Sequence, residues 1–309
     1  MIIIVFIAIL YLNGYVFGSS IDWANQHIVL PEYFRTLFYS DFRLIPKFAY
    51  NIGLGQNIFY FSYYGLLSPV ILISYLFPFI GMSNFIQIIS VISLFISVYL
   101  LYRWINDKYN SKIAFLISLI FILNSPFAYH FHRHLMFVIY MPFMISSLIG
   151  VDKYLKKDKP VLLMLSVVGL IFTSYYFSVS GIITIGIYTL YVLLKDKKFD
   201  YKKLFKVIGV VSISILMSCV ILLPTIYALL NGRLDTFTDN ITLKQILLPF
   251  SNFEQTFYST YYSWGITLIY IYSIIQAFLK KNKDFIFLAI VSSLFIVLPV
   301  CSYLFNAFM

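Results

Sequence analysis

Residues 83–102 read SNFIQIISVISLFISVYLLY, and this stretch decides the class of fold. Its 20 residues carry no charged side chain. As an α-helix they would be about 30 Å long, which matches the hydrocarbon core of a bilayer. Arg103 follows at once, and Lys108 and Lys112 come shortly after it. The stretch therefore predicts a membrane-spanning helix that ends at a basic segment.

The composition extends this prediction to the whole chain. Hydrophobic residues make up 61% of the 309 positions and charged residues 11%, whereas soluble domains have roughly 45–50% and about 25%. This excludes a water-soluble fold. The net charge of +10 comes from lysines grouped between apolar stretches, which indicates topology and not a nucleic-acid partner. Cys219 and Cys301 lie in separate apolar segments, so no disulfide framework or cysteine metal site is expected.

Nine further apolar stretches each predict a membrane-embedded helix or element. They are residues 2–17, 58–80, 113–129, 135–150, 161–177, 178–194, 207–229, 264–279 and 286–308. The stretch 161–194 would be about 51 Å long as one helix, so we expect two helices that meet between positions 173 and 180.

Lysine and arginine are distributed unevenly among the connecting segments. The segments 103–112, 152–159, 195–206 and 280–285 contain 16 of the 22 basic residues. The positive-inside rule places these segments in the cytoplasm. It places the poorly basic segments 18–57, 130–134 and 230–263 outside the cell.

One apolar stretch cannot cross the membrane under this assignment. Two stretches lie between the outside segment 18–57 and the inside segment 103–112, whereas an odd number of crossings is needed. We predict that residues 58–80 are re-entrant or interfacial, because Gly65, Pro69 and Gly81 interrupt them. The sequence thus predicts an all-α polytopic protein of the cell membrane, with about nine transmembrane helices plus this element, in one transmembrane domain over residues 1–309.

The first outside segment is dense in polar side chains. They are Asp22, Gln26, His27, Glu32, Arg35, Asp41, Arg43 and Lys47. Asp22 follows the first apolar stretch closely, so it should lie near the outer interface, and helical spacing would put Gln26 on the same face. A carboxylate at that depth can deprotonate an acceptor hydroxyl, with Asp41 or Glu32 as the alternative base. The competing interpretation is that Asp22 caps a helix over residues 23–38.

A second polar cluster precedes the apolar stretch 135–150. It consists of His130, His132, Arg133 and His134. Cations at a helix end can bind a phosphate group. His130 and His134 are four positions apart and could share a metal, but no carboxylate or thiolate adjoins them, so no metal ligands are assigned and a divalent metal stays open as a cofactor. Interfacial anchoring by a snorkelling Arg133 is the alternative.

Several short blocks, taken in their order and spacing, resemble the YfhO-type bacterial membrane proteins. They are DWANQH at 22–27, YFR at 33–35, GLG at 53–55, YY at 63–64, LSP at 67–69, LFP at 76–78, LLPTIYALL at 222–230 and PVCSYLFN at 299–306. The blocks touch most of the chain. Members of the family are longer, so we expect this chain to be an N-terminal part or a truncated member.

The resemblance implies a glycosyltransferase of the C-type fold that works on the extracytoplasmic face. Such an enzyme takes a sugar from a polyprenyl-phosphate carrier and places it on a cell-envelope polymer such as teichoic or lipoteichoic acid. The implied partners are this donor, the polymer and membrane lipid. By the resemblance Asp22 is the base toward the acceptor, with Gln26 and His27 beside the substrate. Arg133 and its histidine neighbours, or Arg35, would face the departing phosphate.

Two other classes of membrane protein compete with this interpretation. A polytopic transporter or flippase carries ionisable residues near mid-membrane, whereas the charges here gather in the outside segments. A non-catalytic membrane partner would have no need of Asp22. Chemistry at the outer surface is therefore the favoured expectation.

Overall fold

The computed structural model describes Leu12 and residues 22–46, 48–52, 55–124, 127, 133–195, 199–231, 264–298 and 300–301. Helices dominate these residues, as the sequence predicts. The strands in this part of the chain are β1 (Phe48–Ala49) and β2 (Gln56–Asn57), which pair antiparallel. The described residues include only Leu12 of the predicted first apolar helix at 2–17 and only Leu230 and Asn231 of the predicted outside segment 230–263, and they do not include His130 or His132.

The chain divides into two compact units. The first comprises Met1–Leu123, Phe127–Ile145 and Phe172–Ser174, and the second comprises Asn124–Pro126, Ser146–Ile171 and Tyr175–Met309. The long helix α7 (Leu135–Lys157) contributes its first half to the first unit and its second half to the second.

The first unit opens with a helix whose winding changes along its length. η1 (Trp23–Ile28) is a π-helix, and it continues directly into the α-helix α2 (Val29–Asp41). Phe42 ends α2 in the left-handed conformation, with φ of 52°. The predicted helix over 23–38 is therefore present, but its first turn is wider than an α-helical turn. Isolated π-helical turns are often found at functional sites.

Residues 58–76 form a sharply bent helical pair. η2 (Ile58–Tyr64) meets the pair of short helices α3 (Pro69–Ile73) and η3 (Ser74–Leu76) at an angle of 91°. Gly65 makes the bend possible, because its φ is +88° and a Cβ there would lie 2.9 Å from Cγ1 of Ile71. The interruption expected at Gly65 and Pro69 is thus observed. A broken span and a re-entrant loop both show such a bend, so the prediction that 58–80 does not cross the membrane remains a prediction.

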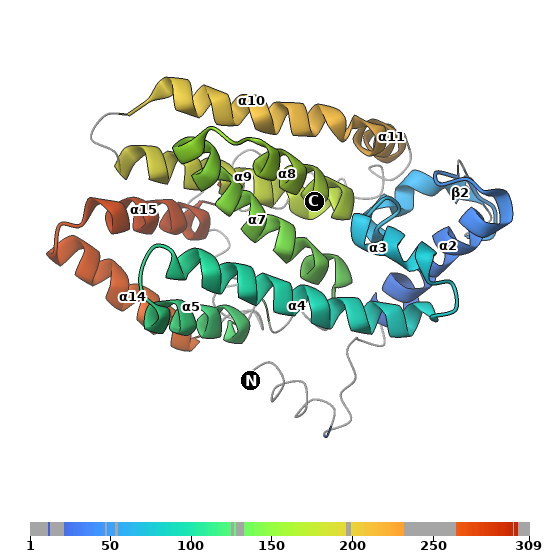
Figure 1. Cartoon of the computed structure of the whole chain (residues 1–309), viewed down its shortest axis with the longest axis horizontal. Helices are drawn as coiled ribbons and strands as arrows, with labels where there is room; N and C mark the ends of the chain where they lie inside the picture. The colour runs from blue at the N-terminus through green and yellow to red at the C-terminus, as the bar shows by residue number, and fades with distance from the viewer. Residues whose placement is uncertain are drawn as a thin grey trace. The chain divides into compact units, whose positions relative to one another are not determined.

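The rest of the first unit is built around a helical hairpin. α4 (Met82–Asn106) and α5 (Ser111–Leu123) pack side by side and are joined by the basic turn that follows Arg103 (Figure 1). The predicted helix at 113–129 ends at Leu123, three residues before Pro126. A core of apolar side chains joins this hairpin to α7. Its members are Leu94, Ile122, Phe127 and Val138.

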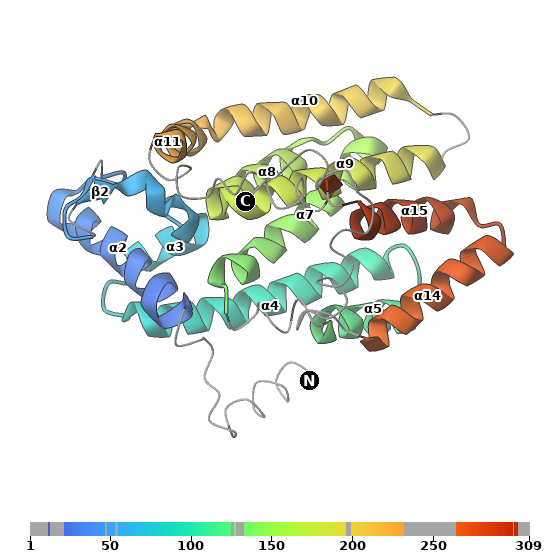
Figure 2. The ribbon, with the colours of Figure 1, turned by 180° about the vertical axis from the view of Figure 1, so that it is seen from behind.

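The second unit continues with antiparallel helices. They are α8 (Val161–Thr173), α9 (Tyr175–Lys195), α10 (Tyr201–Met217), α11 (Cys219–Leu230), α14 (Trp264–Leu279) and α15 (Lys283–Val297). The break between α8 and α9 at Ser174 confirms the two-helix prediction for 161–194. In both views α14 and α15 form a hairpin (Figures 1 and 2), and the hydroxyls of Tyr270 and Ser292 lie 2.6 Å apart across it.

The predicted helix at 207–229 differs from expectation. It begins earlier, at Tyr201, and α10 and α11 are bent by 69° at Ser218. The hydroxyl of Ser218 donates to the carbonyl of Ser214 at 2.8 Å, which is a bond that tends to bend helices. Pro224 in the following helix has no N–H to donate. These local bonds explain a bend that hydropathy alone does not reveal.

Membrane-spanning character is clear in several of these helices. Three of them, α4, α7 and α9, are long and apolar enough to cross a bilayer, and the number rises to five if each bent pair counts as one span. Four shorter apolar helices lie at Ser111–Leu123, Val161–Thr173, Tyr270–Leu279 and Phe285–Leu294. The described chain has the build of an all-α membrane protein, while nine crossings remain a prediction.

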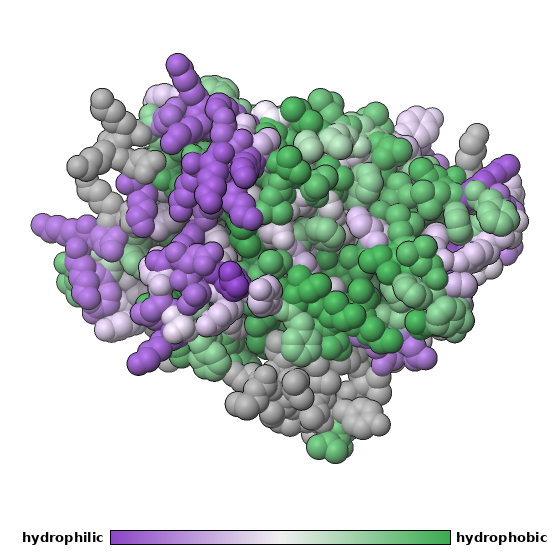
Figure 3. All heavy atoms as spheres, in the orientation of Figure 1, coloured by the Kyte–Doolittle hydropathy of each residue, from purple (hydrophilic) through white to green (hydrophobic). Residues whose placement is uncertain are grey.

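The surface of the second unit separates polar from apolar regions. Figure 3 shows hydrophilic side chains gathered at the end of this unit that carries the α9–α10 and α14–α15 turns. These turns belong to the segments 195–206 and 280–285, which are the predicted cytoplasmic ones. Large apolar side chains are exposed along the helices between the ends, for example Phe205 and Leu216 of α10. Such a division is typical of helices that contact lipid along their length.

Candidate functional site at the start of η1

Asp22 stands where η1 begins, and its side chain does not cap the helix. Its backbone is already helical, with φ of −85° and ψ of −44°, and its carboxylate makes no capping hydrogen bond. The neighbouring Trp23 and His27 are buried, at 2% and 1% exposure, and anchor η1 in the first unit. The structure therefore does not support the interpretation of Asp22 as a helix cap.

The Asp22 carboxylate is instead paired with Arg133. Nε of Arg133 donates to Oδ2 of Asp22 at 2.7 Å. The two residues are 111 positions apart in the sequence. Both side chains are partly shielded, with 34% of Arg133 and 18% of Asp22 exposed. The structure thus brings together the predicted base and one of the predicted phosphate-binding cations.

Two histidines and two tyrosines pack beside this ion pair. The rings of His27 and His134 lie 5.8 Å apart in an edge-on arrangement. His27 also contacts the rings of Tyr64 at 5.4 Å and Tyr63 at 6.2 Å. The tyrosines come from η2, the first arm of the bent pair, whereas His134 directly precedes α7.

Gln26 completes the group, because its Oε1 accepts a hydrogen bond from Oη of Tyr64 at 2.7 Å. We refer to these seven residues as the outer cluster: Asp22, Gln26, His27, Tyr63, Tyr64, Arg133 and His134. Sequence reasoning assigned five of them to the site and missed Tyr63 and Tyr64. The signal was present in the YY block at 63–64, but the packing of η2 against His27 joins segments that are distant in the sequence.

The charge states in the outer cluster follow from burial and from the ion pair. The hydrogen bond from Arg133 holds the pKa of the Asp22 carboxyl below its ordinary value of 3.8, against the opposing effect of partial burial. Burial, with a smaller contribution from His134, lowers the pKa of His27 to about 3, against the opposing effect of Asp22. Burial also lowers the pKa of His134. At neutral pH the cluster therefore holds one carboxylate, one guanidinium and two neutral imidazoles.

Two other predicted site residues lie in different surroundings. Arg35 is buried on α2, where its guanidinium donates to Glu32 at 2.6 Å and to the carbonyls of Ser74 at 3.4 Å and Ile80 at 3.0 Å. It thereby fastens the bent pair to α2. Asp41 is the exposed last residue of α2. The structure does not place either of them in the outer cluster.

The described part of the chain contains no ready-made group of metal ligands. No three histidine, cysteine, aspartate or glutamate side chains there are grouped so that they could hold a metal ion. Nδ1 of His27 is buried and makes no hydrogen bond within the described residues. The outer cluster thus offers a carboxylate, a guanidinium, an imidazole nitrogen and aromatic edges as its chemical groups.

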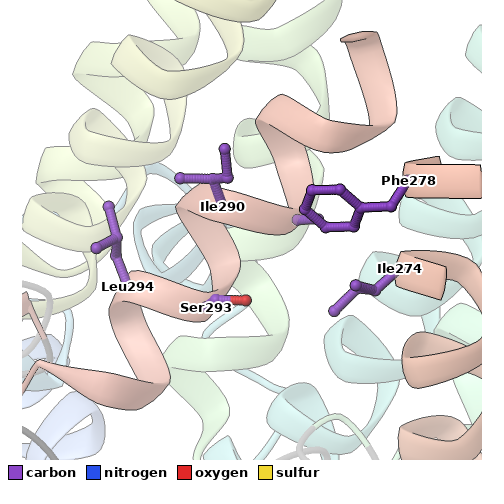
Figure 4. A pocket seen from close by; sticks show the side chains of 6 residues that line it. Ile274, Phe278, Ile290, Ser293 and Leu294 are labelled. Atoms are coloured by element: carbon purple, nitrogen blue, oxygen red, sulfur yellow. The ribbon is translucent and has the colours of Figure 1, made fainter. Parts of the chain in front are cut away.

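A pocket in the second unit offers no comparable chemistry. It has a volume of about 230 Å³ and lies between α14 and α15 (Figure 4). Its lining consists of Ile274, Phe278, Ala289, Ile290, Ser293 and Leu294. No titratable group lines it, so we take the outer cluster as the candidate functional site.

Comparison with known families identifies the family to which the chain belongs. The whole chain, residues 1–309, matches the model of the family described as bacterial membrane protein YfhO. The chain belongs to this family. The DWANQH and YY blocks of this YfhO-family chain contribute five of the seven outer-cluster residues. No curated protein and no solved structure matches the chain.

Proposed function

We propose that this YfhO-family chain is an integral membrane glycosyltransferase with a C-type fold. It transfers a sugar from a polyprenyl-phosphate donor to a cell-envelope polymer of the teichoic or lipoteichoic acid type, on the extracytoplasmic face. Membership of a bacterial membrane protein family and the apolar helices support the membrane setting. About nine spans, with 58–80 as a non-crossing element, would put the outer cluster outside the cell.

The observation that carries the proposal is the Asp22–Arg133 pair. Transfer of a glycosyl phosphate needs a group that accepts the acceptor's proton and a cation that stabilises the departing phosphate. Asp22 and Arg133 supply these two groups within 2.7 Å of each other. The half-buried rings of Tyr63 and Tyr64 add the aromatic surface on which sugar rings commonly pack.

The proposed step conserves atoms and electrons. The acceptor hydroxyl oxygen forms a bond to the anomeric carbon, while the bond from that carbon to the phosphate oxygen breaks and its electron pair stays on the phosphate. The hydroxyl proton passes to the Asp22 carboxylate. Arg133 balances the charge that grows on the phosphate, and Gln26 and His27 lie where they can orient hydroxyl groups.

Labelled sugar transfer tests the proposal directly. Membranes that contain the protein, with any further part of its natural chain, should pass labelled sugar from polyprenyl phosphate to envelope polymer, as followed by thin-layer chromatography. Asp22→Asn keeps the side-chain shape and should lower the rate by about 10² to 10⁴, because general-base assistance is worth that much. Expression and thermal stability should stay close to those of the unmodified protein.

Asp158→Asn is the matched control, because it also removes a carboxylate from an ion pair, in that case the exposed pair with Lys206. Its transfer rate should be unchanged. Full transfer by Asp22→Asn would overturn the assignment of the base and move attention to Asp41 or Glu32. Absence of transfer with every lipid-linked donor would overturn the enzyme proposal itself.

One observation favours the competing transporter or flippase. Asp152 lies near the C-terminal end of α7, where the helix runs into the predicted cytoplasmic segment 152–159; it is 9% exposed and accepts a hydrogen bond from Tyr188 of α9 at 2.7 Å. Ionisable residues within spanning helices are typical of transport paths. If transport is the function, Asp152→Asn should abolish substrate movement in vesicles while Asp22→Asn leaves it intact.

A further inference from the structure

The Asp22–Arg133 ion pair of the outer cluster has to serve two different proposed roles. A base must present its carboxylate to a proton, and a phosphate-binding cation must present its guanidinium to an anion. Here the Nε–H of Arg133 and Oδ2 of Asp22 occupy each other at 2.7 Å. This bond takes up one of the five N–H donors of Arg133 and one carboxylate oxygen of Asp22, and it lowers the basicity of that carboxylate, so both proposed roles are weakened while it holds.

The neighbouring side chains do not substitute for Arg133 as a cation. Among the residues that the structure describes, His27 and His134 are the rings beside the pair that could carry a positive charge, and burial keeps both of them neutral near pH 7. A charge-assisted hydrogen bond of this length is also roughly twice as strong as one between neutral groups. An anion that enters the cluster thus meets Arg133 as a cation already engaged by a carboxylate.

We propose that a phosphate-bearing ligand binds the outer cluster by ion-pair exchange, in which Arg133 leaves Asp22 and pairs with the phosphate. This inference rests on the proposed function and adds an order of events to it. Before the donor arrives, Arg133 suppresses the basicity of Asp22. Once the donor phosphate takes the guanidinium, the carboxylate becomes a stronger base at the moment when a proton must be removed.

The geometry suits such an exchange. Arg133 is the more exposed partner, at 34% against 18% for Asp22, so its guanidinium can turn outward while the carboxylate stays in place. Arginine carries five N–H donors in a planar fork that matches phosphate oxygens. It also stands directly before α7, on a short segment that is not itself part of a helix.

Exchange has a consequence that simple phosphate binding lacks. If Asp22 and the phosphate compete for the same guanidinium, removal of the carboxylate must increase the affinity for the phosphate. Hydrogen bonds to charged groups are worth enough that the gain should be tenfold or more in Kd. Loss of a neighbouring negative charge also favours an anion without any exchange, so the gain in affinity is interpreted together with the Nε–H signal of Arg133 in the wild-type chain.

The experiment measures binding alone, with the full chain in lipid nanodiscs. Farnesyl phosphate is the probe, inorganic phosphate and farnesol are the comparison ligands, and Kd is measured by quenching of tryptophan fluorescence. Asp22→Asn should bind farnesyl phosphate at least tenfold more tightly than wild type, and Arg133→Gln at least tenfold more weakly. Asp158→Asn, which removes an exposed carboxylate elsewhere, should bind as wild type does.

The comparison ligands separate the sources of the phosphate. Farnesol should bind all variants equally, because it has no charge to exchange. An equal gain in affinity for inorganic phosphate in Asp22→Asn would mean that the site recognises the phosphate group alone. A gain in affinity confined to farnesyl phosphate would mean that the lipid is also recognised. Unchanged or weaker binding of farnesyl phosphate by Asp22→Asn would overturn ion-pair exchange.

A measurement on the wild-type chain guards against a variant that does not fold. The chain has five arginines, so ¹⁵N-arginine labelling gives five Nε–H signals, of which that of Arg133 is missing in Arg133→Gln. Farnesyl phosphate should shift this signal, and no shift at saturation would also overturn the proposal. Because no sugar is transferred in these assays, ion-pair exchange and the glycosyltransferase proposal can fail independently of each other.

Discussion

Acid should loosen the outer cluster through His27. Burial lowers the pKa of this imidazole to about 3 from an ordinary 6.5. Between these values the unfolded segment binds a proton and the folded one does not, so stability is complete above pH 6.5 and falls as the pH drops toward 3. One pKa unit corresponds to about 1.4 kcal/mol. Because pH 5.0 lies about 1.5 units below the ordinary pKa of 6.5, a change from pH 7.5 to pH 5.0 should remove about 2 kcal/mol from the free energy of opening η1.

Hydrogen exchange of the amides at 23–30 is the assay, with the protein in nanodiscs at pH 7.5 and 5.0. A loss of about 2 kcal/mol raises the population of the open state about thirtyfold. His27→Gln is the control, because glutamine does not titrate. Comparison of the two proteins at the same pH cancels the intrinsic pH dependence of exchange. It also cancels the contribution of His134, whose pKa is lowered in both.

The outcome of this comparison is decisive for the burial of His27. In wild type the protection of η1 should fall between the two pH values by about thirtyfold more than in His27→Gln. If both proteins lose protection by the same factor, His27 is not held neutral by the cluster. A charged His27 would then act on Asp22 as a second cation beside Arg133.

Three further predictions concern the frame around the site and the topology. Arg35→Gln should lower the stability of the protein by about 1–3 kcal/mol, seen as a lower thermal transition, because it removes the donor to the carbonyl of Ser74 in the bent pair and to that of Ile80 just beyond it. Gly150→Ala should destabilise the protein by about 1–3 kcal/mol, because a Cβ there would lie 2.7 Å from backbone atoms of α8. Gly186→Ala has open space around it and should stabilise the protein by about 1 kcal/mol. A cysteine at the exposed Tyr50 should react with an impermeant maleimide in intact cells, and one at the exposed Lys281 only after permeabilisation; the opposite pattern would invert the topology.

The helices themselves could be predicted from the sequence because their signals are local. The charge-free run at 83–102 and the basic residues that follow it predict α4 and its end. The length of 161–194 requires a break, and the break occurs at Ser174. Gly65 and Pro69 predict an interruption within 58–76, and the bend is found there. In each case a few neighbouring residues determine the backbone.

The contacts of the candidate site could not be predicted in the same way, because they depend on packing between distant segments. Asp22 and Arg133 were both named as site residues, but nothing in the sequence shows that they would pair across 111 positions. Arg35 lies in the same polar segment as Asp22, yet it turns to the carbonyls of the bent pair. The bend at Ser218 depends on a hydroxyl bond that hydropathy does not register.

The bent pair links these observations, because each of its arms is held by a different polar residue of the η1–α2 helix. Gln26 binds Tyr64 on the first arm, and Arg35 binds the carbonyl of Ser74 on the second. Both contacts lie in partly or fully buried surroundings, where a hydrogen bond is stronger and an unpaired polar group costs more than in water. The bend is therefore fixed relative to Asp22. The first arm also places Tyr63 and Tyr64 against His27. Whether residues 58–80 re-enter the membrane or cross it as a broken helix, their first arm forms a wall of the outer cluster.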